Sequence, residues 1–352
     1  MYCSNCGENI EELIGKCPKC GYKVKIDKKT RNIDDIKDRM KNFDKEKEAK
    51  KLDSMGIKGP IVVSLAIVII FTIISIPWKI GGAIKGHEVR KQADLRREVD
   101  SLGYEIDLYE DGVIITDYLN QDRQLVIPET LMDKPILAIG EFAFYGCNIS
   151  EIEMPDSIEV IGKDSFNGSN LTKLKCPANL KIIEETSFAN CNHLAEVELN
   201  EGLEYIESSA FSNCKFQDIV IPSTIIELYS YSFDDYQKFR KIEFKEGEKE
   251  ARIDDSVFSV VEEGINIVVP GNYTYIGSRN FYNAGSITIK RSTVGEEQRI
   301  EGFNCKEFHG TETITDVGSG FDKGVTTIYA PEESFLHEYA LANEIDFVVE
   351  NQ

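Results

Sequence analysis

The chain has 352 residues and a net charge of −21 at pH 7, with 29% charged and 41% hydrophobic residues. The charge is unevenly divided, because residues 1–97 hold 21 Lys or Arg against 13 Asp or Glu, while residues 98–352 hold 19 against 48. A segment with a charge of −29 is not expected to bind nucleic acid or to lie on an anionic membrane. The four histidines fall in no metal or nucleophile motif, and no Gly-rich phosphate loop occurs, so the sequence favours a protein that is not an enzyme.

Residues 1–22 carry two Cys-x-x-Cys-Gly knuckles, formed by Cys3 and Cys6 and by Cys17 and Cys20. Four thiolates at this spacing predict a tetrahedral, structural Zn²⁺ site in a small zinc ribbon. A closed four-cysteine site leaves no position for substrate, and a segment this short depends on the metal for its stability. Its few basic residues give little reason to expect nucleic-acid binding.

Residues 23–58 are rich in charge and poor in large apolar side chains, and we interpret them as a solvated linker. Residues 59–78 contain no charge, and at about 1.5 Å per residue they reach about 30 Å, the thickness of the hydrocarbon layer of a bilayer. They predict a single transmembrane helix. Residues 79–100 are again charged and predict a juxtamembrane stalk.

The sidedness of this predicted membrane protein is indicated by cysteine chemistry rather than by charge. Basic residues are equally numerous at 40–59 and at 79–97, so the positive-inside rule does not choose an orientation. A four-thiolate zinc site is easiest to keep in a reducing compartment, which places the N-terminus in the cytosol and the C-terminal domain outside the cell.

From residue 101 the chain repeats one phrase at a nearly constant spacing. The phrase begins with Ile139-Gly140, continues with Ala143-Phe144 and ends with Cys147. Its phenylalanine recurs at intervals of 22, 22, 23 and 22 residues, in the order Phe144, Phe166, Phe188, Phe211 and Phe233. A fixed period of this size predicts a leucine-rich-type solenoid, in which the phenylalanines stack in a buried column.

Between successive phenylalanines lies a short alternating segment, such as Ile152 and Met154, which predicts one strand per unit with one buried face. The outward positions change sign from unit to unit, as from Glu151 and Glu153 to Lys173 and Lys175. This pattern favours a ladder of opposite charges between strands over a charged ligand-binding face. Cys147, Cys191 and Cys214 share one place in the repeat with Ser169, which predicts a small buried column rather than a set of disulfides.

The regular period loosens towards the C-terminus. Lys245–Arg252 forms a charged insertion and is a candidate contact loop. Residues 331–344 predict a helix and residues 345–349 a closing strand, as expected for the cap of an open solenoid core.

The repeated phrase and the strands that end in Ile-Pro resemble the BspA-type leucine-rich repeats of bacterial surface proteins over residues 101–350. Residues 104–128 resemble the first rungs of that family, and residues 334–348 resemble its C-terminal cap. The resemblance implies a leucine-rich-repeat domain at 101–352 with a parallel sheet and a role in cell-surface binding and adhesion.

Taken together, the sequence predicts a single-pass, membrane-anchored protein that recognises a protein or cell-surface ligand through the solenoid. The alternative is a membrane scaffold or sensor that couples an outside ligand to a cytosolic partner through the zinc ribbon. Tyr273, Tyr275 and Tyr282 are the candidate contact residues, because aromatic side chains dominate interface energetics.

Overall fold

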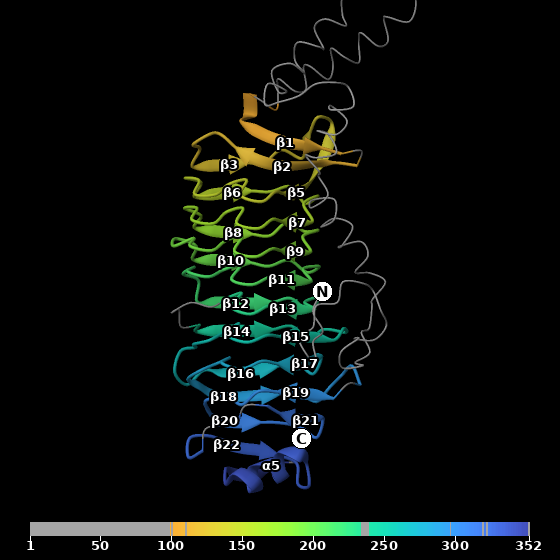
Figure 1. Cartoon of the computed structure of the whole chain (residues 1–352), viewed down its shortest axis with the longest axis vertical. Coiled ribbons are helices and arrows are strands. Elements are labelled where there is room, and N and C mark those ends of the chain that lie inside the picture. The colour runs from red at the N-terminus through yellow and green to blue at the C-terminus, as the bar shows by residue number, and fades with distance from the viewer. Residues whose placement is uncertain are drawn as a thin grey trace, which may run out of the picture. The chain divides into compact units, whose positions relative to one another are not determined.

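The computed structural model describes residues 99–350, except residues 100, 110, 234–238, 296, 319 and 322. These residues form a solenoid with strands stacked rung on rung (Figure 1). The predicted zinc ribbon, linker and membrane helix lie outside the described residues, as does the stalk apart from Val99. Within the described residues, no helix is both long and apolar enough to cross a membrane.

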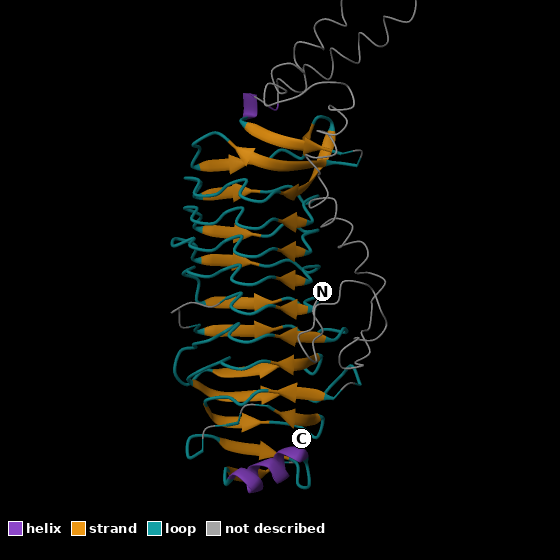
Figure 2. Cartoon of the chain, in the orientation of Figure 1, coloured by secondary structure: helices purple, strands orange, loops and turns teal. Residues whose placement is uncertain are grey.

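Two columns of strands run along the solenoid (Figure 2). The first, here called the long sheet, is twelve-stranded. It contains β1 (Tyr104–Leu108), β2 (Val113–Tyr118), β5 (Lys134–Ile139), β7 (Val160–Ile161), β9 (Ile182–Ile183), β11 (Tyr205–Ile206), β13 (Glu227–Leu228), β15 (Ala251–Ile253), β17 (Tyr273–Ile276), β19 (Gln298–Ile300) and β21 (Ile314–Val317), with β4 (Thr130–Leu131) beside β5.

The second column, here called the segmented column, consists of separate short sheets that follow one another. They are β3 (Gln124–Val126) with β6 (Glu151–Glu153), β8 (Lys173–Lys175) with β10 (Glu196–Glu198), β12 (Asp218–Ile221) with β14 (Lys241–Phe244), and the five strands β16 (Asn266–Val269), β18 (Ala284–Ile289), β20 (Cys305–His309), β22 (Thr327–Ala330) and β23 (Asp346–Val349). Strand pairs in both columns are parallel, except β1 with β2 and β4 with β5.

The expectation of one strand per unit is therefore wrong, because each central unit has two. The missed strand holds the isoleucine that opens the repeated phrase, as in Val160–Ile161. Both residues of this strand are buried, so no alternation of polar and apolar residues marks it in the sequence. The alternating strands of the segmented column occur where the sequence predicts them.

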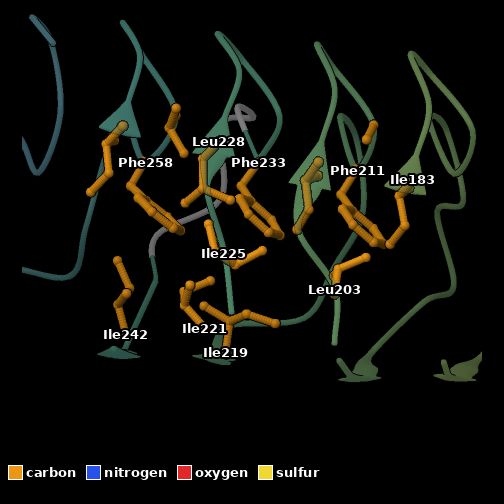
Figure 3. Packing of buried hydrophobic residues seen from close by; sticks show 14 of the residues in the cluster. Ile183, Leu203, Phe211, Ile219, Ile221, Ile225, Leu228, Phe233, Ile242 and Phe258 are labelled. Atoms are coloured by element: carbon orange, nitrogen blue, oxygen red, sulfur yellow. The ribbon is translucent and has the colours of Figure 1, made fainter. Parts of the chain in front are cut away.

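The core between the two columns contains the predicted phenylalanine column. Rings from Phe144 to Phe258 stack with centroids 4.9–5.3 Å apart and planes within 9° of parallel. Figure 3 shows Phe211, Phe233 and Phe258 side by side, with Leu228 of the long sheet on one side and Ile242 of the segmented column on the other. The prediction that Phe166, Phe188 and Phe211 are buried and stacked is confirmed.

The turn before each phenylalanine has a fixed backbone conformation. Seven residues have φ between 53° and 63°, and each lies two positions before a phenylalanine of the column or before Phe281, which stacks on Phe258: Phe142, Asp164, Thr186, Ser209, Tyr231, Ser256 and Arg279. This left-handed region costs a side-chain-bearing residue about 1–2 kcal/mol. Amides of the same turns donate to the next rung, as from Phe166 N to Ser187 O at 2.7 Å, so bonds between rungs offset the strain.

Small side chains form a second column beside the rings. Ser169, Cys191 and Cys214 are buried, and Ser169 Oγ lies 3.2 Å from Cys191 Sγ. All five cysteines of the described residues are free thiols. The predicted small buried column, without disulfides, is confirmed for these positions, while Cys147 at the N-terminal end of the column is only half-buried.

The ends of the solenoid are closed differently. At the N-terminal end, β1 and β2 form an antiparallel pair that continues into β5. At the other end, α5 (Phe335–Asn343) inserts Leu336 and Ala340 into the core, and the Ser334 side chain accepts a hydrogen bond from His337 N as its N-cap. The predicted helix and closing strand are confirmed with slightly narrower bounds.

Candidate binding face

The outward side chains of the segmented column form a charged face. Lys173 Nζ on β8 lies 3.1 Å from Glu196 and 3.0 Å from Glu198 on β10. Exposed pairs of this kind contribute about 0.2–1 kcal/mol each. The predicted ladder of opposite charges is therefore present between β8 and β10, and it uses one lysine rather than both.

The face is hollowed at one of the boundaries between the short sheets of the segmented column. β14 pairs with β12, and β16 pairs with β18, so no ladder joins β14 to β16. A cleft of about 510 Å³ opens on this boundary. Its walls contain three cations and two carboxylates above an apolar floor: Arg240, Lys241, Lys290, Glu243 and Glu246, with Ile242, Phe244, Ile265, Val268 and Pro270.

The charges around the cleft are arranged as short ion pairs. Lys241 Nζ lies 2.7 Å from Glu243, Lys290 Nζ 3.2 Å from Glu246, and Arg240 Nη2 2.9 Å from Asp218. The hydrogen bond to Glu243 raises the pKa of Lys241, and the same bond lowers the pKa of Glu243. Both groups therefore remain charged at neutral pH, and the cleft presents fixed charges of both signs.

The cleft lies beside a longer repeat. The interval from Phe233 to Phe258 is 25 residues, against 22 for the interval that precedes it. Two of the three extra residues lie between Ile242 and Ile253, the stretch that contains the predicted insertion Lys245–Arg252. Ion pairs join this insertion to earlier rungs. Lys245 Nζ lies 2.6 Å from Glu201, and Lys249 Nζ lies 3.0 Å from Glu204, both two rungs back.

On its other side the insertion is tied to the following rungs. The Thr274 hydroxyl donates to Glu250 at 2.8 Å, and the Asn272 amide donates to Lys249 O at 3.0 Å. The insertion therefore packs along the solenoid, and its role as a contact segment stays a prediction. Glu246 is the residue of this segment that reaches the cleft.

The three candidate tyrosines do not come together. Tyr273 is 1% exposed and packs against the Phe244 ring, so it is unavailable to a partner and its prediction as a contact residue is wrong. Tyr282 is 49% exposed in the turn after Phe281. Tyr275 lies half-buried on the outer side of the long sheet, with the Arg252 guanidinium 4.4 Å from its ring centroid.

Tyr275 belongs to a row of polar and aromatic residues along the long sheet. Strand register places Tyr205, Glu227, Arg252, Tyr275, Arg299 and Asp316 in line. Burial and the nearby Asp254 raise the pKa of Glu227, and Arg252, whose Nε is 3.6 Å away, opposes the shift. Arg252 therefore contacts both of its neighbours in this row, Glu227 and Tyr275.

Sequence reasoning missed an uncharged outward row in the C-terminal strands of the segmented column. Register aligns Val268, Thr288, His309, Tyr329 and Val348. His309 stacks on Tyr329 with centroids 4.5 Å apart, and its Nδ1 lies 2.8 Å from Glu350. The alternation of these strands was the available signal, because every second residue of an exposed strand faces outward.

The predicted zinc ligands Cys3, Cys6, Cys17 and Cys20 lie outside the described residues. Among the residues that the structure does describe, no group of three or more His, Cys, Asp or Glu side chains is arranged to hold a metal ion.

Comparison with known families identifies the repeats. The family profile described as "BspA type Leucine rich repeat region" matches residues 123–240 and 202–297 with six copies. The repeats are of the BspA leucine-rich type. The BspA-type region covers β3 through the residues that precede β19, and so includes both walls of the cleft.

Solved structures give further similarities to the BspA-type solenoid. A leucine-rich cell surface protein from Faecalibacterium prausnitzii has a TM-score of 0.47 and 17% identity over 66% of this chain and 75% of that chain. A leucine-rich repeat protein from Bacteroides ovatus has a TM-score of 0.40 and 16% identity over 70% and 98%. The pneumococcal vaccine antigen PcpA has a TM-score of 0.33 and 15% identity over 71% and 97%. No curated protein matches the chain.

Proposed function

We propose that the BspA-type solenoid is a binding module that recognises a protein or other cell-surface ligand, and that the cleft between β14 and β16 is its main contact point. The observation that carries this proposal is the cleft itself, which opens on an exposed sheet face and has fixed charges of both signs above an apolar floor. Such a site suits a ligand that carries charged groups around an apolar part. Recognition of this kind requires no catalytic residue.

The proposal predicts that reversing charge at the cleft weakens binding strongly. Arg240→Glu combined with Lys290→Glu is expected to weaken ligand binding by about a hundredfold, because acidic groups of the ligand would face two carboxylates in place of two cations of the cleft. The measurement is a screen of the chain against arrays of matrix proteins and cell-envelope glycans, followed by titration of the hits at two salt concentrations.

The matched control is Lys173→Glu, which reverses a charge on the same face between β8 and β10, away from the cleft. It should leave binding within about twofold, since surface charges distant from a contact act mainly through screened, long-range forces. Equal loss in both variants would refute the cleft as the contact point. If the chain converts a bound compound and loses this activity when a single carboxylate is changed, the solenoid is an enzyme and the proposed binding function is refuted.

We further propose that residues 59–78 anchor the module in the cell membrane, with a zinc-loaded ribbon at residues 1–22 in the cytosol and the solenoid outside. Support comes from the uncharged twenty-residue span and from the two Cys-x-x-Cys-Gly knuckles. In the alternative, a sensor or scaffold, the ribbon would bind a cytosolic partner when the solenoid binds its ligand.

This arrangement predicts that protease added to intact cells removes the solenoid and leaves a protected N-terminal fragment. The fragment should carry one Zn²⁺ per chain in the wild type and none after Cys17→Ser, since three thiolates no longer close the site. Mass spectrometry identifies the fragment and metal analysis counts the zinc. Protection of the solenoid from protease in intact cells would place it in the cytosol. A wild-type fragment without zinc would refute the predicted metal site.

A further inference from the structure

The C-terminal end of the segmented column has a strand with one open edge. β23 pairs with β22 and is the last strand of its five-stranded sheet, and no other described strand lies on its far side. At the N-terminal end of the solenoid, the long sheet instead ends in the antiparallel pair β1–β2. An open sheet edge presents unpaired amides and carbonyls to any extended chain that approaches it.

Strand alternation identifies the open backbone groups. Register pairs Asp346 with Thr327 and Val348 with Tyr329, and Glu350 N donates to Ala330 O at 2.9 Å. In a parallel ladder the amide and carbonyl of one residue point to the same side, and those of the next residue point to the other. The backbone groups of residues 346, 348 and 350 therefore face β22, and those of Phe347 and Val349 face the open edge.

The side chains of β23 suit extended pairing. Val348 and Val349 are 43% and 48% exposed. The cap helix α5 covers the core with Leu336 and Ala340, which are fully buried, but it leaves these two valines in solvent. Exposed β-branched residues on an edge without proline or lysine favour strand pairing, and Asp346 and Glu350 are the charged residues that restrict it.

The charge around the edge selects the partner. Residues 331–350 contain six Asp or Glu and no Lys or Arg. Two of these carboxylates have partners of their own, because Glu344 pairs with Lys323, and Glu350 lies 2.8 Å from His309 Nδ1. The remaining surplus of negative charge attracts a basic segment.

A second copy of the same strand fits poorly. Antiparallel pairing centred on Val348 would place Asp346 opposite Glu350 of the other copy at both ends, and parallel pairing in register would place Asp346 beside Asp346. Like charges directly opposite each other in a sheet are destabilising. A partner with basic residues at these positions would instead form two opposite-charge pairs.

We propose that the open edge of β23 binds an extended basic segment of another protein by strand addition. The segment would carry Lys or Arg opposite Asp346 and Glu350 and an apolar residue opposite Val348, a pattern of basic residues four positions apart with an apolar residue midway. Main-chain bonds to Phe347 and Val349 would hold it, and the flanking charges would set its register. The proposal uses no residue of the cleft, so it stands or falls independently of the proposed function.

The test uses the full chain and a fluorescent five-residue strand peptide with lysines at its ends, valine at its centre and threonine between them. Val349→Pro removes one amide that faces the open edge and none that faces β22, so the fold should remain while the peptide binds about tenfold more weakly, the equivalent of about 1.4 kcal/mol. Val349→Thr keeps both the amide and the shape and is the matched control, with binding expected to be unchanged.

A second variant guards against a folding defect in the proline variant. Asp346→Lys leaves the backbone intact and should weaken the lysine peptide while improving the binding of a peptide that has glutamates at its ends. Equal binding by Val349→Pro and Val349→Thr would overturn the proposal, and so would equal binding of the lysine and glutamate peptides by the wild type. Self-association of the chain that Val349→Pro abolishes would overturn it in favour of a second copy.

Discussion

Phe188→Ala is expected to lower the free energy of unfolding by about 3–5 kcal/mol, through lost transfer energy and the cavity left behind. Phe188 is fully buried, and its ring stacks on Phe166 at 5.2 Å and on Phe211 at 5.3 Å. The substitution therefore removes two ring contacts at once, each worth about 0.5–1.5 kcal/mol beyond burial. Urea unfolding of residues 101–352, followed by circular dichroism, measures the loss.

The matched control for this prediction is Phe142→Ala. Phe142 is 50% exposed and lies two positions before a column phenylalanine, so the same atoms are deleted on the surface. We expect a loss of under about 1 kcal/mol, and under about 0.5 kcal/mol for Lys175→Ala on an outward strand position. Equal losses in the free energy of unfolding for Phe188→Ala and Phe142→Ala would show that the phenylalanine column does not stabilise the core.

The buried cysteines of the native chain are expected to react with iodoacetamide at least about a hundredfold more slowly than those of the unfolded chain. Burial raises the pKa of Cys176 to about 12, of Cys191 to about 11 and of Cys305 to about 12. Alkylation requires the thiolate, which is scarce at pH 8 in these environments. Peptide mapping of the alkylated chain over time measures each site separately.

The pH dependence of labelling gives an internal check. In the native chain the alkylation rates of Cys176 and Cys191 should still rise about tenfold per pH unit above pH 9. In urea these rates should level off once the pH exceeds the ordinary thiol pKa of about 8.5. Because folding raises these pKa values, their contribution to stability is complete below about pH 9 and is lost as the pH rises through the folded-state values. Rapid native labelling of Cys191 would contradict its burial, and the half-buried Cys147 should react first.

Periodicity made the core of this fold predictable. The phenylalanine column, the Cys and Ser column and the alternating strands each leave a mark in the sequence, because their residues must recur at fixed places to stack. The second strand of the early units left no such mark, since both of its residues are buried, as at Val160 and Ile161 and at Ile182 and Ile183. Two buried residues in a row fit a strand, a turn or a helix equally well.

The error at Tyr273 has a specific cause. Tyr273 and Tyr275 are two residues apart, and this spacing predicts that both lie on one face of a strand. The register of β15 with β17 shifts between Ala251 and Arg252, so Tyr273 aligns with buried Ala251 and Tyr275 with half-buried Arg252. A bulge of this kind moves one side chain to the other face, and nothing in the local sequence marks it.

The cleft could be located only in part from the sequence. The insertion at Lys245–Arg252 marks the longer repeat, but the break in the ladder and the ion pairs of Lys245 and Lys290 depend on rungs two periods away. Contacts across more than 40 residues leave no local pattern from which they could be inferred.

The bonds that run from rung to rung also determine how the solenoid responds to force. The turn amides, such as Phe166 N to Ser187 O, and both strand columns lie parallel to the long axis, so a pull from end to end loads successive rungs in series. Each rung that yields frees about 22 residues, or about 70 Å of extended chain. A domain held at both ends would therefore lengthen in discrete steps of nearly equal size and absorb mechanical work at each one.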